Sequence, residues 1–154
     1  MEPDLSGDGP IHDVTPALAC WSHVGFGLHD LAVGMSVGSD GTADEICLVL
    51  LSGSVRIIAG DLDTGMLQGR ASVFDKVAPH AVYVPMKTIW QVEAGSDSEL
   101  AVCRAPGTEG KLPPRLIGSQ NMPLETRGTG SNVRHVCNIL PAVSYTHLRA
   151  HETR

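Results

Sequence analysis

The stretch Glu45-Ile46-Cys47-Leu48-Val49-Leu50-Leu51-Ser52-Gly53 decides the fold of this chain. It is a short, continuous apolar run that closes at a turn glycine. A strand with one wet face would alternate between apolar and polar residues, and this run does not. The sequence therefore predicts a strand that has no wet face.

Similar runs follow at near-regular spacing, each bounded by Gly, Pro, Asp or Ser, and this pattern is typical of an all-β sandwich or barrel. Turn-rich loops are expected at residues 38–41 and 60–65. No amphipathic helix of ten or more residues is apparent. The predicted apolar runs and strands lie at residues 54–59, 69–74, 81–85, 88–93 and 99–104. The side chains expected inside the sandwich are those of Leu48, Leu50, Val82, Val84 and Val102.

An alternating stretch precedes the central run, at residues 21–31. One set of its side chains is apolar and points one way, whereas the other set holds glycine and histidine and points the opposite way. We therefore predict a half-buried strand. The apolar set is Val24, Phe26 and Leu28, and the other set is His23, Gly25, Gly27 and His29.

Composition limits the classes of function. At 154 residues the chain has the length of one domain, with 42% hydrophobic and 18% charged residues, which indicates a globular protein. Its 11 basic and 17 acidic residues give a net charge of −6 without a basic run, so we expect no nucleic-acid partner. No apolar segment reaches the roughly 18 residues of a membrane span, so we expect no membrane partner. The acidic, polar N-terminus does not have the pattern of a secretory signal.

The four cysteines are far apart and form no C-x-x-C pair. Cys47 and Cys103 lie inside apolar runs, where a thiol behaves as a small core side chain. We therefore expect core thiols rather than a disulfide or a zinc site, and a reducing cytoplasm as the location.

The chain divides into four predicted segments. Residues 1–18 form a loose N-terminal segment, and residues 19–107 form the β barrel. Residues 108–142 are expected to be an extended, wrapping segment, because Pro113, Pro114 and Pro123 cannot occupy a central strand. Residues 143–154 do not continue the preceding pattern and are expected to be a non-native tail.

The order of a strand, a glycine turn, a strand and a proline-led turn resembles the cupin layout. Several blocks in order are also similar to 5-deoxy-glucuronate isomerase, a two-cupin family of myo-inositol breakdown. These blocks are residues 45–53, 69–75, 81–85 and 101–107, then Pro113-Pro114-Arg115-Leu116-Ile117 and residues 127–140. The similarity runs from about Trp21 to Pro141 and corresponds to the N-terminal half of that family. It implies a single cupin-type jelly roll, the first of two.

The resemblance also implies a function. The family converts 5-deoxy-glucuronate into 5-dehydro-2-deoxy-gluconate, an aldose–ketose exchange, and its divalent metal is held by the second cupin. We therefore expect no cofactor in this chain and a small sugar acid as the partner of the intact enzyme. A homo-oligomer is a possible assembly. The catalytic residues are unknown, and no metal ligand is predicted.

Cupins that bind metal carry a His-x-His pair, a glutamate and a third histidine. When the turn at Ser52-Gly53 is aligned, Ile46 occupies the glutamate position, and no histidine lies near residues 40–42. When Pro85 is aligned, Trp90 occupies the position of the third histidine. Glu45 is one residue away from the ligand position, and a shift of one residue turns a strand side chain to the opposite face.

The histidines have alternative interpretations. His23, His29 and His80 are each expected to be surface or hydrogen-bonded side chains rather than ligands. His147 and His151 would form a metal pair if the tail were helical, but a non-native tail would make that spacing a coincidence.

The block Arg127-Gly128-Thr129-Gly130-Ser131-Asn132-Val133-Arg134 is the polar cluster with the clearest functional interpretation. Arg127, Asn132 and Arg134 are candidates for binding substrate, because the planar guanidinium donates two parallel hydrogen bonds to a carboxylate. The alternative, which we favour, is a linker whose glycines turn the chain and whose arginines pair with acidic neighbours.

Two hypotheses follow for the whole chain. In the first, it is the non-metal half of a sugar-acid isomerase and is inactive alone. In the second, it is a free-standing cupin that binds a small sugar acid without catalysis.

Overall fold

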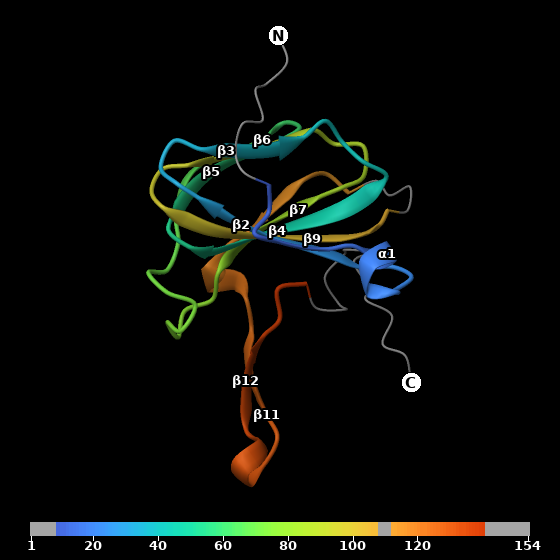
Figure 1. Ribbon diagram of the computed structural model, residues 1–154. Coiled ribbons are helices and arrows are strands. Elements are labelled where there is room, and N and C mark those ends of the chain that lie inside the picture. The colour runs from blue at the N-terminus through green and yellow to red at the C-terminus, as the bar shows by residue number, and fades with distance from the viewer. Residues whose placement is uncertain (1–8, 108–111, 141–154) are drawn as a thin grey trace.

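The computed structural model describes residues 9–107 and 112–140, and two facing antiparallel sheets form its body (Figure 1). The six-stranded sheet has the order β1-β2-β9-β4-β7-β10, and the four-stranded sheet has the order β3-β8-β5-β6. The first comprises β1 (His12–Val14), β2 (Gly25–Leu31), β4 (Asp44–Ser52), β7 (His80–Val84), β9 (Ser98–Pro106) and β10 (Arg115–Ile117). The second comprises β3 (Ser36–Ser39), β5 (Ser54–Ala59), β6 (Leu62–Gln68) and β8 (Trp90–Ala94).

The remaining elements are a hairpin and three short helical turns. The hairpin joins β11 (Leu124–Arg127) to β12 (Arg134–Cys137) and extends away from the two sheets (Figure 1). The turns are α1 (Pro16–Ala19), η1 (Ser119–Asn121) and η2 (Gly130–Asn132). None reaches ten residues in the described part of the chain, as the sequence predicted.

The dry core lies between the two sheets. Leu48 on β4 is directly opposite Val82 on β7 and Val102 on β9, and all three are 0% exposed. Leu50 and Val84 are also buried in this cluster, so the predicted core residues are confirmed. Residues of the four-stranded sheet close the core from the other side: Val55, Ile57, Ala59, Trp90, Val92 and Ala94.

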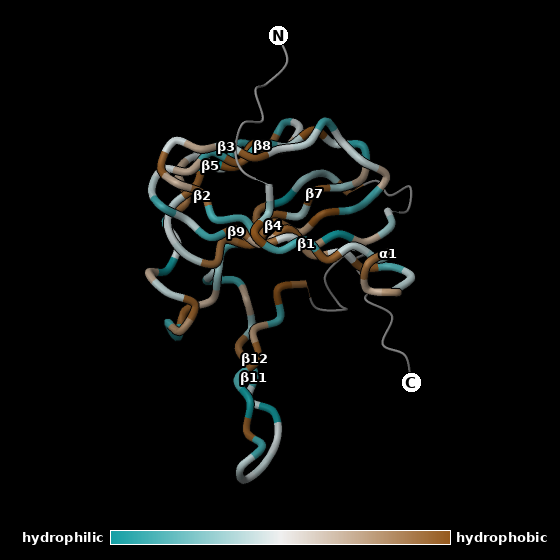
Figure 2. The backbone as a smooth tube through the Cα atoms, in the orientation of Figure 1, coloured by the Kyte–Doolittle hydropathy of each residue, from teal (hydrophilic) through white to brown (hydrophobic). Residues whose placement is uncertain are grey.

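A second apolar cluster covers the outer face of the six-stranded sheet. Cys47 and Val49 on β4 point to this face, where Ile117 and Met122 from the C-terminal segment pack against them. Partly buried Ile139 adds to the cover. Figure 2 shows the corresponding brown sections of chain, whereas the hairpin is mostly teal or white toward its tip. Strand β4 is therefore covered on both faces, which explains its continuous apolar run.

The prediction of a strand at residues 69–74 is wrong, because side chains bond the backbone locally in this segment. Asp75 Oδ2 accepts hydrogen bonds from the backbone nitrogens of Ala71 (3.0 Å) and Ser72 (3.1 Å). Ser72 Oγ accepts another from the nitrogen of Phe74 (3.2 Å). Such bonds replace a strand ladder, and the Phe74 side chain remains 91% exposed.

The loop predicted at residues 60–65 is shorter than expected. A turn at Gly60 and Asp61 leads directly into β6, where Leu62 is opposite Ala59. Polar residues are tolerated in this strand because β6 is at the edge of its sheet. Arg56 on β5 also donates from Nε to Asp63 Oδ1 across the pair (3.0 Å).

The strand predicted within residues 21–31 is confirmed as β2, but its glycine and histidine face is the buried one. Gly27 and His29 are opposite Val102 and Leu100, so they share the inner face with core residues. His29 is 7% exposed, whereas Phe26 points to the outer face and is 37% exposed. Hydrophobicity alone therefore gave the wrong direction for this strand.

The segment before residue 19, expected to be loose, holds two elements in its described part. Strand β1 pairs with β2 through Asp13 and Gly27, and α1 follows. Thr15 caps α1, because its Oγ1 accepts a hydrogen bond from the nitrogen of Leu18 (3.3 Å). The tail from residue 143 onward lies outside the described residues, together with His147 and His151.

Candidate functional site

The three predicted substrate-binding residues lie together at the end of the β11–β12 hairpin. Arg127 and Arg134 are directly opposite each other in the register, and Asn132 lies in η2 between the two strands. All three are exposed. The hairpin extends from the body, so this cluster forms a projecting tip (Figure 1).

Contacts within the hairpin explain the geometry of its tip. Arg127 donates from Nε (2.9 Å) and Nη2 (2.7 Å) to Glu125 Oε2 on the same strand. Gly128 has φ +94°, and a Cβ there would collide with the carbonyl oxygen of Asn132. The glycine therefore turns the chain, and one of the two arginines is paired with an acidic neighbour. Whether the tip contacts a substrate stays a prediction.

The barrel interior has apolar side chains at the positions where metal-binding cupins have ligands. Ile46 is 3% exposed and Trp90 is 5% exposed, and both belong to the core between the sheets. Glu45 lies next to Ile46 but is on the opposite face of β4, as the strand period requires. These residues do not fit a divalent metal. No group of three His, Cys, Asp or Glu side chains in residues 9–107 and 112–140 has the spacing of a metal site.

A small polar cluster occupies the inner face near strand β2. Arg104 Nη1 forms an ion pair with Asp13 Oδ1 (3.1 Å). A Cβ at Gly27 would be 3.3 Å from Arg104 Nη2, a tight contact, so the glycine leaves room for this guanidinium, and His29 Nε2 is 3.6 Å away. Burial, and then the charge of Arg104, lower the pKa of His29, while Asp13 raises it. The neutral imidazole is therefore favoured in this cluster.

A different set of polar groups is buried on the outer face of the same sheet. Tyr83 on β7 is directly opposite Cys47, which in turn is opposite Cys103. Burial, and then the neighbouring Glu45, raise the pKa of Tyr83 to about 12. Burial, and then Cys103, raise the pKa of Cys47 to about 12. Glu45 is 1% exposed, and its Oε2 has no hydrogen-bond partner in the described part of the chain.

The cysteines of the described residues are all free thiols, including Cys47 and Cys103, which face each other on neighbouring strands. The expectation of core thiols rather than a disulfide is confirmed for Cys47, which is buried. Cys20 is exposed instead, at the end of α1. In the described residues, no helix is long and apolar enough to cross a membrane.

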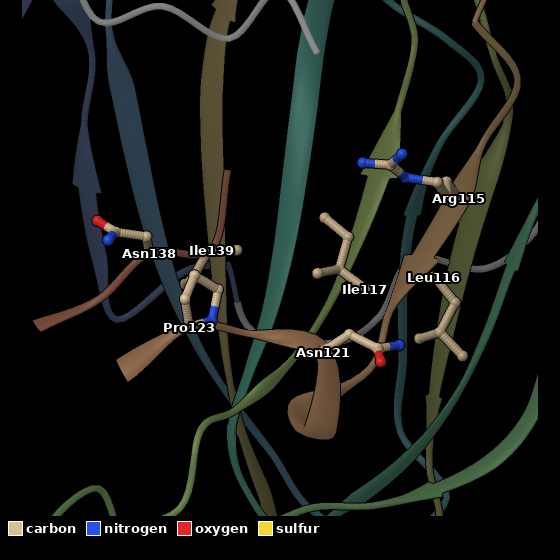
Figure 3. Close-up of a pocket in the computed structure, with 7 residues that line it drawn as sticks. All are labelled: Arg115, Leu116, Ile117, Asn121, Pro123, Asn138 and Ile139. Atoms are coloured by element: carbon tan, nitrogen blue, oxygen red, sulfur yellow. The ribbon is translucent and has the colours of Figure 1, made fainter. Parts of the chain in front are cut away.

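A pocket opens between β10 and the base of the hairpin. It has a volume of about 280 Å³. Polar and apolar side chains share its lining: Arg115, Leu116, Ile117, Asn121, Pro123, Asn138 and Ile139. In Figure 3, Arg115 and Asn138 lie on opposite sides of the pocket, with Ile117 between them.

Strand pairing and two hydrogen bonds hold the pocket walls in place. Strand β10 pairs with β7, with Arg115 opposite Tyr83 and Ile117 opposite Ala81. The backbone nitrogen of Ser119 donates to His80 Nδ1 (3.3 Å), which ties η1 to β7. At the hairpin base, the nitrogen of Asn138 donates to the carbonyl oxygen of Pro123 (3.3 Å).

Sequence reasoning missed this pocket. Its arginine, Arg115, follows two prolines. Its two asparagines, Asn121 and Asn138, are far apart in the sequence. The prolines predicted an extended segment, but only the fold of the hairpin brings its two ends back beside β10. No spacing rule in the sequence indicates that closure.

The two facing antiparallel sheets and their dry interior define an all-β domain of the cupin type. The KduI/IolB family model matches residues 1–152, and the chain belongs to this family.

Solved and curated relatives agree with this assignment. The chain is 41% identical over 134 residues to the 5-deoxy-glucuronate isomerase of Geobacillus kaustophilus, covering 87% of this chain and 48% of the relative. It is 33% identical over 131 residues to the enzyme of the same name from Bacillus subtilis strain 168, covering 85% and 48%. The crystal structure of an IolB-like protein from Salmonella typhimurium LT2 superposes with a TM-score of 0.83 and 41% identity, covering 88% of this chain and 51% of that one. The chain thus spans about half the length of the relatives that it matches.

Proposed function

We propose that this chain forms the N-terminal half of a 5-deoxy-glucuronate isomerase, which converts 5-deoxy-glucuronate into 5-dehydro-2-deoxy-gluconate in myo-inositol catabolism. The observation that carries the proposal is the 41% identity over 134 residues to the Geobacillus kaustophilus enzyme of that name. The match extends along 87% of the chain, so it is a property of the whole domain rather than of one motif. A cytoplasmic location belongs to the same proposal.

In this proposal the chain supports catalysis without holding the catalytic metal. Ile46 and Trp90 occupy the ligand positions of a metal cupin, and both are packed into the core. A metal could reach these two positions only if the packed core between the sheets opened. The divalent metal of the enzyme is therefore assigned to a second cupin, and this domain would supply a scaffold.

The chemistry explains why we expect the chain to be inactive alone. Moving a proton between adjacent carbons of a sugar acid creates enediolate charge, which must be stabilised while an acid–base group transfers the proton. The core between the sheets is lined by apolar side chains at the ligand positions. The loss of electrostatic stabilisation and of acid–base catalysis together removes several orders of magnitude in rate.

The alternative is a free-standing cupin that binds a small sugar acid without catalysis. The pocket lined by Arg115 is the observation that favours it, because a ligand site would exist within this domain. The two proposals differ in whether the gene continues in frame beyond codon 141. Sequencing the genomic DNA there distinguishes them, and a downstream cupin with a His-x-His pair supports the isomerase.

The activity test uses purified chain incubated with 5-deoxy-glucuronate and a series of divalent ions, with the product followed by NMR. We expect no turnover above the uncatalysed rate, and turnover when the downstream cupin is expressed in the same polypeptide. Turnover by the chain alone that survives repurification, and that persists when the chain ends at Pro141, would contradict the assigned role. If the longer polypeptide also fails to turn over, the isomerase proposal itself is wrong.

A further inference from the structure

The outer face of the six-stranded sheet is only partly covered by the described residues. Its apolar cover centres on β4 and β7, where Ile117 and Met122 pack. The outward side chains of β2 are those of Phe26, Leu28 and Asp30, because alternate residues of a strand share a face. Phe26 and Asp30 are exposed. The β2 side of the outer face, called the open face below, therefore lacks cover in the described part of the chain.

Exposed aromatic side chains are found on the same side of the sheet. Three of the six aromatic residues of the chain are exposed, namely Trp21, Phe26 and Phe74. Trp21 is two residues beyond the end of α1, and Phe74 lies in the loop between β6 and β7. In Figure 1, α1 and this loop both lie on the side of the sheet from which the hairpin projects. Aromatic side chains are typical anchors of protein–protein interfaces, so this side has the composition of a docking surface.

The hairpin is an arm that projects beside this surface (Figure 1). All four residues of β11 are exposed, and β11 pairs only with β12. A two-stranded hairpin alone is marginally stable in water. The arm therefore gains stability when a partner surface covers it.

The arm carries an unmatched positive charge. Arg127 is paired with Glu125, whereas Arg134, directly opposite Arg127, is exposed and has no ion-pair partner in residues 9–107 and 112–140. Like charges that are directly opposite each other in a sheet repel. An external carboxylate would relieve this repulsion.

The open face carries the opposite charge. Asp30 on β2 is directly opposite Glu99 on β9, so two carboxylates share this end of the outer face. Glu99 accepts a hydrogen bond from Ser52 Oγ (3.1 Å), and neither carboxylate forms an ion pair with a Lys or Arg that the structure describes. The open face therefore presents exposed Phe26 beside an acidic pair that suits an arginine.

We propose that two copies of this chain pair through these surfaces, with the arm of each copy lying on the open face of the other. Arg134 would lie beside the partner's Asp30 and Glu99, and the arm would cover the partner's Phe26. A two-fold axis uses each surface twice, and one chain carries both the arm and the face that the arm fits. At a net charge of −6, two copies repel each other at long range, so their contact needs a basic element such as this arm.

This inference does not rest on the isomerase proposal. It depends on the arm and the open face, and dimerisation can be measured without substrate. A monomeric chain would leave the isomerase assignment unaffected, and a failed activity test would leave the dimer unaffected.

The first experiment measures the mass of the full chain by size-exclusion chromatography with light scattering. At about 100 µM, which nearly fills an interface of micromolar Kd, we expect about twice the chain mass of 16.3 kDa. Arg134→Glu and Asp30→Lys, both at exposed positions, should each raise the dimer Kd at least about tenfold. Asp40→Lys is the matched control, because it makes the same charge change next to β3 in the four-stranded sheet and should leave the dimer unchanged.

The second experiment mixes equal amounts of the Arg134→Glu and Asp30→Lys chains. The mixed pair should form again, because one of its two contacts joins the two altered side chains and the other joins the two original ones, each with opposite charges. Native mass spectrometry identifies the mixed pair. A monomeric unaltered chain overturns the proposal, as does a dimer that withstands both charge reversals or a mixture that yields no mixed pair. Should either variant fail to fold by circular dichroism, Arg134→Gln and Asp30→Asn remove the charges alone, and a dimer that neither weakens overturns the proposal too.

Discussion

Both faces of the six-stranded sheet are covered at strand β4, but by different means. The inner face packs against a second sheet, and its side chains are almost all aliphatic. The outer face packs against residues 112–140, and it holds two cysteines, Tyr83 and the carboxyl of Glu45. Two faces of one strand therefore have different chemistry, although the sequence of β4 is continuously apolar.

The difference shows what each face can tolerate. A polar group buried without a hydrogen bond costs free energy, and on the inner face the indole Nε1 of Trp90 is such a group in the described part of the chain. The outer face is covered by a segment that also turns away into a hairpin, and this leaves a pocket at Arg115. The outer face therefore combines buried polar groups with an open pocket, whereas the inner face is mostly a dry core with one polar cluster at β2.

The largest expected effect is a truncation on the inner face. Leu50 is 0% exposed, and its Cδ2 is close to Gly69 as well as to the core. Leu50→Ala should lower the free energy of unfolding by roughly 2–5 kcal/mol, because it removes buried surface and leaves a cavity. Chemical denaturation monitored by circular dichroism measures the change.

Leu124→Ala is the control for this truncation, since Leu124 is 61% exposed on the hairpin. It should change the free energy of unfolding by less than about 0.5 kcal/mol. A loss of under about 0.5 kcal/mol for Leu50→Ala would place Leu50 on the surface and make the register of β4 wrong.

The next effect concerns the outer face. Tyr83→Phe removes the buried hydroxyl that neighbours Glu45, and it should destabilise the fold by roughly 1–3 kcal/mol at neutral pH, because Glu45 then loses a polar neighbour. A loss below about 0.5 kcal/mol would mean that Glu45 finds another partner. The variant also has a signature in its pH dependence.

The pKa of Tyr83 is raised in the folded state from 10.0 to about 12, so the folded protein holds this proton more tightly than the unfolded chain. Its contribution is therefore fully present below pH 10.0 and is lost as the pH rises toward 12. For one proton the slope approaches about 1.4 kcal/mol per pH unit. Tyr83→Phe should remove that part of the alkaline loss, which unfolding curves from pH 9 to 12 can measure, while the raised pKa of Cys47 still contributes to both proteins.

The central architecture could be predicted from the sequence because it depends on local signals. Continuous apolar runs closed by turn glycines predicted β4 and β5, and the five inward side chains follow from the strand period. The strand period alone also predicts that the side chains of Glu45 and Ile46 point to opposite faces of β4. The KduI/IolB family match agrees with the resemblance drawn from the ordered blocks.

The errors arise where partners distant in sequence decide the outcome. The glycine and histidine face of β2 is buried because it lies on the inner side of the sheet, where Arg104 and Pro10 flank Gly27, and these residues are far apart along the chain. The apolar residues within 69–74 predict a strand, but Asp75 accepts hydrogen bonds from the backbone there instead. The Arg115 pocket depends on the return of the hairpin to the sheet.

A smaller effect is expected at the hairpin tip. Arg127→Ala removes the exposed ion pair with Glu125, and such pairs contribute roughly 0–1 kcal/mol. The free energy of unfolding should therefore change by less than about 0.5 kcal/mol at 0.15 M salt. A loss above about 1 kcal/mol, measured by the same denaturation assay, would show that the hairpin is a structural support of the sheet rather than a projection from it.

The smallest effect is a change in the titration of His29 on the inner face of the six-stranded sheet. Burial comes first among the causes that lower its pKa from 6.5, and the charge of Arg104 comes second. Because the folded state disfavours protonation, the contribution of His29 to stability is present above pH 6.5 and is lost as the pH falls toward the lowered pKa. Arg104→Gln should raise the pKa of His29, since it removes the opposing charge and leaves Asp13, which favours the protonated ring. Titration of the histidine ring signals by NMR measures the shift. An unchanged or lower pKa of His29 in the variant would mean that Asp13 already cancels the charge of Arg104, so that burial alone keeps this imidazole neutral.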